Sequence, residues 1–562
     1  MIQFSQINDL ATLAFLLNIP LKKLTYILYV KHPDSYYSTF EIPKANGETR
    51  TIHAPSSDLK TIQSTLASIL SSHVQEYNKT HSIKADISHA FEKNKSIMTN
   101  ASVHRHKRFI LNVDLKDYFD HFHFGRVRGF FHKSNYFKFP IKIATVLAQL
   151  TCYNGKLPQG APTSPVITNM ISNILDMRLL PIVKKYGLDY TRYADDMTFS
   201  TNRKDFKRKH LAFLKELRTE INNFGFEIND KKTRIIYNDS HQEVTGLVVN
   251  QKVNVCRTFY KNTRAMANSL YTTGEFQING CSGTMNQLDG RFSFIQQIEK
   301  YNALDETNNK SFYNLSSRGR EYQRFLFFKY FYANERPLIV TEGDTDINYI
   351  KSALKNLYAE YPRLITKNRD STFTFHVSFL KRSPRLKDYL GIFPDGADTM
   401  QNIYHAYTGK DKFPNYEEYF KKTTGHLPSQ PVILLFDNEQ IHDKPLKKFL
   451  KHIHQKKLNA SEAKNIHTNL YVATIPLLDN VEECEMEDLF EQPTLSHLIG
   501  GKTFCRKDDY DTSKFYGKRI FSNYIANNYL SINFDQFRPL LDLIDQTIVN
   551  YHNLEKTIEE SK

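Results

Sequence analysis

The stretch TRYADDMTFS, residues 191–200, sets two neighbouring carboxylates, Asp195 and Asp196, between β-favouring residues. This pattern predicts a hairpin whose turn carries the acids, where water can simply solvate them. The alternative is a metal site, because neighbouring carboxylates repel each other unless a divalent cation offsets their charge. Taken alone, these ten residues favour the plain turn, and the rest of the chain must decide.

A buried strand upstream supplies a third acid. RFILNVDL, residues 108–115, is a continuous apolar run that ends with Asp114, a pattern typical of a strand inside a sheet. Nucleotidyl transfer uses two divalent ions about 3.5–4 Å apart, one activating the attacking hydroxyl and one holding the triphosphate and leaving group. If this strand neighbours the hairpin, Asp114, Asp195 and Asp196 can supply the ligands.

The order of motifs over about residues 5–300 resembles that of a reverse transcriptase. The matching segments are IPKANGETR (42–50) in the fingers, NVDLKDYFD (112–120), LPQGAPTSP (157–165), YADD (193–196) and GFEINDKKTR (225–234). The resemblance implies that Asp114, Asp195 and Asp196 bind two Mg²⁺ ions and catalyse DNA synthesis from dNTPs. It also implies nucleotide-binding roles for three residues and a helper: Arg50 at the triphosphate, Phe119 as a gate against ribonucleotides, Gln159 near the incoming base, and Lys44.

Two further motifs resemble those of bacterial retron reverse transcriptases, namely NASVH (100–104) and VTG (244–246). The resemblance implies priming from a ribose 2′-hydroxyl of a guanosine in a cognate structured noncoding RNA. The product would be a branched multicopy single-stranded DNA (msDNA). The RNA-binding positions carried over from these motifs are Asn100, His104, Val244, Thr245 and Gly246.

The charge distribution agrees with a polyanionic partner. The chain carries a net charge of +15, and residues 1–300 hold 40 Lys and Arg against 25 Asp and Glu, whereas residues 301–562 hold 35 of each. The whole surplus therefore lies in the first half, as expected of a nucleic-acid-binding region. A generally basic, soluble surface is the plainer alternative.

The last 230 residues alternate between strand and helix patterns, which predicts an α/β domain with a mostly parallel sheet. Glu342 ends the strand in LIVTEGDTD (338–346), and Asp437 and Glu439 end the strand in VILLFDNE (432–439). Acids at the carboxyl ends of parallel strands suit a Mg²⁺ site, although ordinary solvated turns would look similar.

These acids resemble the active site of a Toprim domain of the OLD-nuclease kind, with Glu439 standing where a second Asp is usual. The resemblance implies one or two Mg²⁺ ions bound by Glu342, Asp437 and Glu439, with Glu342 in acid/base chemistry. Further positions carried over from the family are Asp346, Gly396, Glu487, Asp488 and Lys518. In retron systems such a module is a toxic effector, as in a toxin–antitoxin pair, held in check by the RNA–DNA product and released during phage infection.

The expected fold is therefore an α+β right-hand polymerase with fingers, palm and thumb, followed by an α/β Rossmann-like Toprim domain. We expect the reverse transcriptase at 1–310, with fingers and palm at about 1–240 and thumb at about 241–310. A linker at 311–335 and a Toprim-like domain with a C-terminal extension at 336–562 complete the prediction. The five cysteines form no CxxC pair and are expected to be reduced thiols. No membrane anchor is evident, so we expect a cytoplasmic protein, with self-association left open.

Local patterns predict several further elements. Residues 38–55 alternate like a hairpin that turns at Asn46-Gly47, and a helix follows with Ser57 or Asp58 as its cap. Segments 165–187 and 205–225 are helical, 277–290 is an exposed loop, and 372–380 is a strand. Tyr193 could be a core aromatic residue or could line the primer site.

Two rival functions remain at this point. The chain could be another class of bacterial reverse transcriptase, against which the NASVH and VTG motifs speak. It could also be an RNA-binding scaffold whose Toprim-like domain only mediates interactions. A primer-extension assay separates the scaffold from a polymerase, because a scaffold would not incorporate dNTPs.

Overall fold

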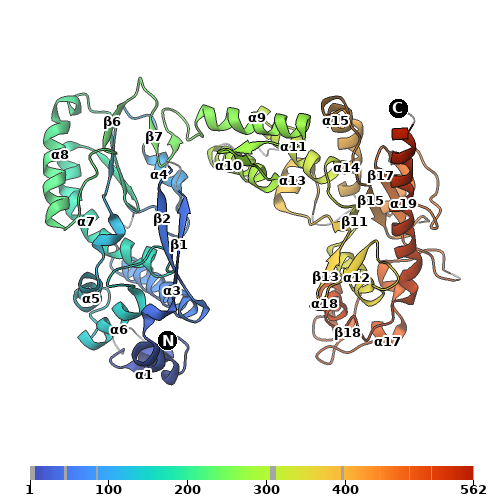
Figure 1. The fold of residues 1–562 in the computed structure, drawn as a ribbon, viewed down its shortest axis with the longest axis horizontal. Helices are drawn as coiled ribbons and strands as arrows, with labels where there is room; N and C mark the ends of the chain where they lie inside the picture. Colours follow the sequence, from blue (N-terminus) through green and yellow to red (C-terminus); the bar gives the residue numbers. More distant parts are fainter. Residues whose placement is uncertain are drawn as a thin grey trace. The chain divides into compact units, whose positions relative to one another are not determined.

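The computed structural model describes residues 7–43, 47–83, 86–303, 312–393, 398–441, 444–479, 481–507 and 509–560. The chain divides into two compact units (Figure 1). The first unit comprises residues 1–257 and 298–304, and the second comprises residues 258–297 and 305–562.

A four-stranded antiparallel sheet, in the order β4-β5-β3-β6, lies in the first unit. The inner strand β3 (Phe109–Asp114) is buried at every position except Asn112, as its apolar sequence predicts. It pairs with β5 (Asp196–Thr201), so that Asp114 lies opposite Asp196. The outer strands are β4 (Asp189–Tyr193) and β6 (Arg234–Tyr237). The predicted buried strand beside the YADD hairpin is therefore confirmed.

Helices with one apolar face cover this sheet. The patterns at 165–187 and 205–225 form α7 (Ser164–Tyr186) and α8 (Phe206–Asn223), which contribute Leu175, Leu179 and Phe213 to the core. Helix α7 ends at Gly187, whose φ of 65° is one that glycine adopts without strain. The other helices of the unit are α1 (Leu10–Leu16), α2 (Leu21–Thr25), η2 (Tyr26–Lys31), η3 (Pro33–Tyr36), α3 (Ser57–Thr80), α4 (Ile97–Val103), η4 (Tyr118–His121), α5 (Phe124–Lys133) and α6 (Ile141–Thr151).

Two hairpins complete the first unit. The predicted hairpin at 38–55 forms antiparallel β1 (Tyr37–Pro43) and β2 (Thr49–Pro55), and Asn46 of its predicted turn, like Lys44, lies outside the described residues. Helix α3 follows with Ser56 as its N-cap, one residue before the first predicted cap. The second hairpin consists of β7 (Glu243–Val244) and β8 (Leu247–Val248) and packs against α4.

The second unit contains a five-stranded sheet in the order β14-β11-β15-β17-β16. Strands β11 (Leu338–Val340), β14 (Ser378–Phe379), β15 (Val432–Phe436) and β17 (Leu470–Thr474) are parallel, and β16 (Lys464–His467) is antiparallel to β17. Leu338 and Val340 enter one hydrophobic core and Ile339 enters another, so helices cover both faces of the sheet. The predicted α/β pattern with a mostly parallel sheet is confirmed.

One core of the second unit also contains α9 (Arg257–Thr273) and α10 (Met285–Ala303), which we expected in a thumb within residues 1–310. The expected linker at 311–335 contains the buried helices α11 (Ser317–Phe327) and η5 (Phe328–Tyr332). The domain boundary at 310 and the linker are therefore wrong. Aromatic side chains of α11 and η5, such as Phe325 and Phe327, pack on α10, on α14 (Asp398–Thr408) and on α15 (Tyr416–Thr424).

Two local predictions in the second unit also differ from the structure. Residues 277–290, expected as a loop, form the hairpin β9 (Gln277–Ile278) and β10 (Cys281–Ser282) and the start of α10. The single strand expected at 372–380 is divided between β13 (Phe373–Phe375), which pairs with β12 (Ile365–Lys367), and β14 of the main sheet.

The remaining elements of the second unit are α12 (Asp344–Asn356), α13 (Pro384–Leu390), α14 (Asp398–Thr408), α15 (Tyr416–Thr424), α16 (Pro445–His452), η6 (Met486–Leu489), α17 (Gln492–Leu495), β18 (Thr503–Phe504), β19 (Phe515–Tyr516), α18 (Lys518–Asn527), η7 (Asp535–Phe537) and α19 (Arg538–Glu560). All five cysteines are free thiols, as predicted. Among the described residues, α7 is long and apolar enough to cross a membrane, and so is the bent pair Leu10–Leu16 and Leu21–Lys31 if counted as one span. In α7, 56% of the most apolar window is buried inside the protein, as in a core helix.

Candidate active sites

The hairpin of β4 and β5 presents the paired acids through a two-residue turn, Ala194 and Asp195. Tyr193 pairs with Asp196, and Ala194 has a φ of 56°, as a tight hairpin turn requires. The Leu115 N–H donates to the Asp195 carbonyl oxygen at 3.1 Å, which fixes the turn to the end of β3. The sequence therefore brings Asp114, Asp195 and Asp196 together at one end of the sheet.

The three acids repel one another. Burial raises the pKa of Asp195, and the charge of Asp114 raises it further. The pKa of Asp196 rises to about 6 because of lost solvation and the charges of Asp195 and Asp114. Lys232 opposes this repulsion, since its Nζ lies 2.9 Å from Asp114 Oδ2, and Asn229 Nδ2 donates to Asp114 Oδ1 at 3.1 Å.

Carboxylate oxygens are the ligands that Mg²⁺ prefers, and a divalent cation would offset the repulsion that raises both pKa values. The residues present therefore fit the metal that the motif implies. Among the described residues, no three His, Cys, Asp or Glu side chains already converge as a finished metal cage. Lys232 supplies a positive charge at Asp114.

A cavity of about 960 Å³ opens beside the acids. Its lining includes the residues predicted to bind the nucleotide together with two of the acids, namely Arg50, Phe119, Gln159, Asp114 and Asp195. Gln159 is tied to the strand that carries Arg50, because the His53 N–H donates to the Gln159 carbonyl oxygen at 2.8 Å. This close approach of the two backbone segments requires a glycine directly after Gln159. Gly160 has a φ of 118°, and an added Cβ would lie 2.8 Å from the His53 carbonyl oxygen.

A smaller cavity of about 370 Å³ touches the other side of the same strands. Asp114, Asp196 and Lys232 line it together with Thr245 and Gly246. Those last two residues form the turn of β7 and β8 with φ values of 47° and 79°, as a two-residue hairpin turn demands. The VTG motif thus lies beside the paired acids, a proximity that its sequence did not predict.

Three of the five predicted RNA-binding side chains are buried. His104 has no exposed surface and hydrogen-bonds Ser200 Oγ and Thr191 Oγ1, each at 2.7 Å, and burial lowers its pKa to about 3. Asn100 is fully buried in α4, and Val244 is 1% exposed. The side chains of His104, Asn100 and Val244 therefore lie inside the protein, where they join α4 to the sheet and to the hairpin, and their contact with RNA stays a prediction. Thr245 is half-buried and Gly246 is exposed.

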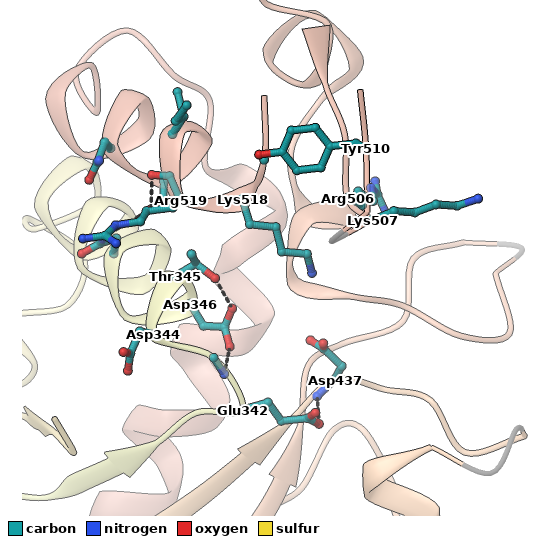
Figure 2. Close-up of a pocket in the computed structure, with 16 residues that line it drawn as sticks. Glu342, Asp344, Thr345, Asp346, Asp437, Arg506, Lys507, Tyr510, Lys518 and Arg519 are labelled. Carbon is teal, nitrogen blue, oxygen red and sulfur yellow. Dashed lines mark hydrogen bonds between the residues drawn. The ribbon is translucent and has the colours of Figure 1, made fainter. Parts of the chain in front are cut away.

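The second unit gathers acids where β11 and β15 end (Figure 2). The Asp437 N–H donates to Glu342 Oε1 at 3.1 Å, and the Met486 N–H donates to Asp437 Oδ1 at 3.0 Å. In the first turn of α12, Asp346 accepts a hydrogen bond from the Gly343 N–H at 2.9 Å. Burial, with the charge of neighbouring acids, raises the pKa of Glu342 to about 8, of Asp346 to about 6 and of Asp437 well above its usual value.

Lys518 reaches this acidic cluster from the start of α18. Its Nζ lies 3.1 Å from Oε2 of Glu487, which is 1% exposed, and 3.5 Å from Oε2 of Glu485. A cavity of about 960 Å³ lies above Glu342, Asp346 and Asp437, and its rim is basic, with Arg506, Lys507, Lys518 and Arg519 among its lining residues (Figure 2). Buried acids with raised pKa values fit a divalent cation, and the basic rim fits an anion.

Two residues predicted for this site, Glu439 and Asp488, do not line the cavity. Glu439 Oε1 forms an ion pair with Lys444 Nζ at 2.9 Å, and Glu439 does not line the cavity. Asp488 is paired with Arg506, one of the cavity's cations. Gly396 lies outside the described residues. The structure thus joins Glu342, Asp346, Asp437 and Lys518 around one cavity, with Glu487 directly behind Lys518.

The sequence was then compared with those of known proteins. Residues 42–258 match the family model of reverse transcriptases, RNA-dependent DNA polymerases. The retron Ec86 reverse transcriptase of Escherichia coli is 35% identical over 296 residues, which cover 52% of this chain and 85% of that protein. The chain belongs to the retron reverse transcriptases. It is therefore an RNA-directed DNA polymerase with the reverse-transcriptase fold.

Two further relatives of this chain are also retron reverse transcriptases. The retron Mx65 reverse transcriptase of Myxococcus xanthus is 31% identical, over 47% of this chain and 61% of that protein. The retron Ec73 reverse transcriptase of Escherichia coli is 33% identical, over 39% and 69%. Among solved structures, apo telomerase from Candida tropicalis aligns with a TM-score of 0.31 and 12% identity, over 53% of this chain and 61% of that chain.

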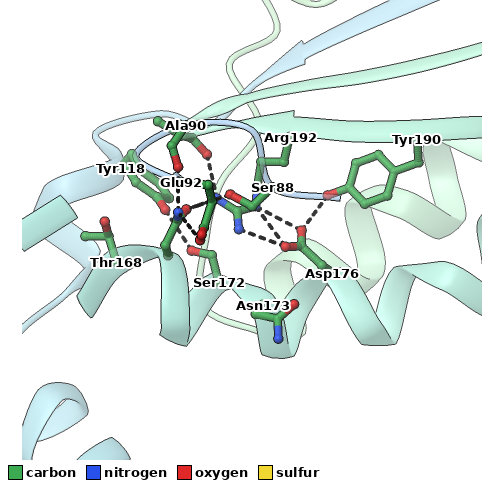
Figure 3. Close-up of polar contacts among 12 residues, drawn as sticks. Ser88, Ala90, Glu92, Tyr118, Thr168, Ser172, Asn173, Asp176, Tyr190 and Arg192 are labelled. Atoms are coloured by element: carbon green, nitrogen blue, oxygen red, sulfur yellow. Dashed lines mark hydrogen bonds and ion pairs between the residues drawn. The ribbon is translucent and has the colours of Figure 1, made fainter. Parts of the chain in front are cut away.

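A buried ion pair beneath the hairpin escaped the sequence reasoning (Figure 3). Arg192 and Asp176 of this retron reverse transcriptase have no exposed side-chain surface, and Arg192 Nη2 lies 2.8 Å from Asp176 Oδ2. Arg192 Nη1 also donates to the Ala194 carbonyl oxygen at 3.2 Å, and the Tyr190 hydroxyl donates to Asp176 at 2.7 Å. The sequence carries a sign of this pair, because Arg192 lies between the uncharged residues Thr191 and Tyr193 of the predicted hairpin, but the sequence does not identify the partner of Arg192.

Tyr193, which could equally have been a core residue or a lining of the primer site, is half-buried and lines neither of the two cavities beside the acids.

Proposed function

We propose that this retron reverse transcriptase copies part of a cognate structured noncoding RNA into DNA, beginning from a guanosine 2′-hydroxyl of that RNA. The product is branched msDNA. The observation that carries the proposal is the cavity lined by Asp114 and Asp195 on one side and by Arg50, Phe119 and Gln159 on the other. A carboxylate metal site suits the triphosphate group of a nucleotide, and the basic, aromatic and amide side chains across the cavity suit its phosphates, sugar and base.

Each residue of this site has a proposed role. Asp114, Asp195 and Asp196 would hold two Mg²⁺ ions, which would supply activation of the attacking hydroxyl and stabilisation of the charge on the triphosphate. Arg50 binds the triphosphate of the incoming dNTP, Phe119 lies against its sugar and excludes a ribose, and Gln159 borders its base. Lys232 keeps Asp114 in place until the cation is bound.

The RNA partner is proposed to contact the exposed VTG turn. Thr245 and Gly246 line a cavity with Asp114 and Asp196, so an RNA held there lies next to the reaction. We also propose a cytoplasmic location, in keeping with five free thiols.

The test separates priming from polymerisation. Asp195→Ala combined with Asp196→Ala is expected to abolish both msDNA synthesis on the cognate RNA and extension of a DNA primer on an RNA template. Asp205→Ala, which removes an exposed acid paired with Lys209 elsewhere in the same unit, is the control and retains both. Persistence of msDNA in the double variant, or primer extension by the parent without any 2′-branched product, contradicts the proposal.

For the second unit we propose a Toprim-like, Mg²⁺-dependent nuclease that acts as the toxic effector in anti-phage defence. Its support is the cluster of Glu342, Asp346 and Asp437 beneath a basic rim, where a phosphodiester would meet both metal and cations. Glu342 has a raised pKa and suits acid/base chemistry. The msDNA–RNA product is proposed to restrain this effector until infection.

A second candidate for this unit is a non-catalytic interaction domain. It is favoured by Glu439, which pairs with Lys444 and does not line the cavity. Glu342→Gln decides between the two: the nuclease proposal expects loss of cell toxicity and of phage protection, with msDNA synthesis unchanged. Glu418→Gln, which makes the same change at an exposed glutamate paired with Lys422 outside this cavity, is the matched control. Full toxicity and protection in Glu342→Gln rule out the nuclease.

A further inference from the structure

Phe91 has an unusual environment for a large apolar side chain. It is 55% exposed, and it lines the same cavity as Asp114 and Asp195. Its φ is 59°, and among the described residues it is the one large hydrophobic side chain with a positive φ. For a bulky apolar residue, both this backbone conformation and contact with water raise the free energy of the folded protein. Such strained residues cluster at functional sites.

Buried Asn169 of α7 holds the segment around Phe91 in this conformation. Its Nδ2 donates to the Ala90 carbonyl oxygen at 2.6 Å and to Glu92 Oε1 at 3.1 Å, which are the two neighbours of Phe91. Its Oδ1 accepts from Ser88 Oγ at 2.9 Å. The exposed ring therefore projects from a backbone that is fixed on both sides.

The same amide connects Phe91 to the catalytic turn. Asn169 Oδ1 accepts from Arg192 Nη1 at 3.2 Å, and that nitrogen also donates to the carbonyl oxygen of Ala194, the residue before Asp195. The Arg192 N–H donates to the Ile87 carbonyl oxygen at 2.9 Å. One buried network thus sets both the loop of Phe91 and the position of the acids.

We propose that Phe91 is a stacking platform for a nucleobase in the polymerase cavity, an inference that rests on the proposed location of the polymerase site. The ring is not part of the core cluster of this unit, so a face remains for a ligand. Stacking on an aromatic ring tolerates any base, as a polymerase requires. Arg50, Lys156 and Lys231 line the same cavity and supply charge for phosphates. The base belongs either to the template strand or to the incoming nucleotide.

The chain contains no tryptophan, so Phe91→Trp creates a single fluorescent reporter at this position. The experiment adds poly(rA) annealed to a dideoxy-terminated oligo(dT) primer to the full-length protein, and then dTTP. Quenching on addition of the template–primer assigns the stacked base to the template, and quenching only after dTTP assigns it to the incoming nucleotide. Phe15→Trp, at a ring 73% exposed on α1 and outside this cavity, is expected to stay unquenched in both steps. No quenching of Trp at position 91 by bound template–primer and dTTP overturns the proposal.

Kinetics supply an independent arm. Phe91→Asn removes the ring but tolerates a positive φ, whereas Phe91→Tyr keeps the ring. We expect Phe91→Asn to raise the Kd for template–primer or the KM for dTTP about tenfold or more, and Phe91→Tyr to remain within about twofold of the parent. Parental Kd and KM in Phe91→Asn overturn the proposal. Failure of the polymerase site itself has a different signature, since Asp195→Ala would then remain active.

Discussion

Removing the charge of Asp176 should destabilise the first unit strongly. Asp176 and Arg192 have no exposed side-chain surface, and three contacts of 2.8–3.1 Å join them. Asp176→Asn leaves the guanidinium buried without its counter-charge. Loss of one partner of a buried ion pair costs about 3–5 kcal/mol, so the equilibrium constant for opening should rise roughly 10²- to 4 × 10³-fold. The polymerase rate should fall as well, because Arg192 also holds the Ala194 carbonyl of the catalytic turn.

Hydrogen exchange followed by mass spectrometry measures this opening in the correct unit. The slowest amides of β3 and β5 report the first unit alone, whereas a melting curve would mix the transitions of two units. A compensating variant, Asp176→Leu with Arg192→Met, should recover most of the stability, because an apolar pair of similar size replaces both charges. It should not recover polymerase activity. The reasoning is refuted if the free energy of opening measured by exchange in Asp176→Asn lies within about 1 kcal/mol of the parental value, or if the double variant is fully active.

Three further predictions concern single sites. Because burial lowers the pKa of His104 to about 3 in the folded protein, its contribution to stability is present above about pH 6.5 and is lost as the pH falls. Pulse proteolysis should therefore show the first unit losing roughly 3 kcal/mol between pH 7 and pH 4, and less in His104→Gln. Gly160→Ala forces a Cβ against the His53 carbonyl and should lower kcat/KM for dNTPs roughly 10- to 100-fold, whereas Gly155→Ala, at a positive φ with no atom within 4 Å, should not. Asp289→Asn in the second unit leaves Lys329 and Arg385 without the acid they share, and hydrogen exchange of α10 and α11 should accelerate to match a loss of about 3 kcal/mol; unchanged exchange contradicts this.

Local patterns predicted the parts of the fold that depend on nearest neighbours. The apolar run ending at Asp114 and the acids flanked by β-favouring residues are each visible within ten residues, and the register of β3 with β5 brings them together. The same holds for the strands that end before Glu342 and Asp437, whose parallel pairing follows from alternation with helices.

Contacts between distant segments could not be predicted in this way. Nothing near Arg192 in sequence indicates Asp176, and the burial of His104 depends on Ser200 and Thr191, which are 96 and 87 residues away. The polar start of the segment at 301–335 concealed a helix whose aromatic residues, such as Phe325, are buried by α10. Burial is a property of tertiary partners, so a motif identifies a residue more reliably than it identifies what that residue touches.

The central claim is that Asp114, Asp195 and Asp196 form the polymerase site of this retron reverse transcriptase. The most direct measurement is the single-turnover rate of dTTP incorporation on poly(rA)–oligo(dT) with Mg²⁺, for the parent and for Asp195→Asn, alongside the Kd for the template–primer. The account predicts a loss of about 10³-fold or more in rate with an unchanged Kd, because metal-bound charge stabilisation contributes several kcal/mol. A rate within tenfold of the parent contradicts it.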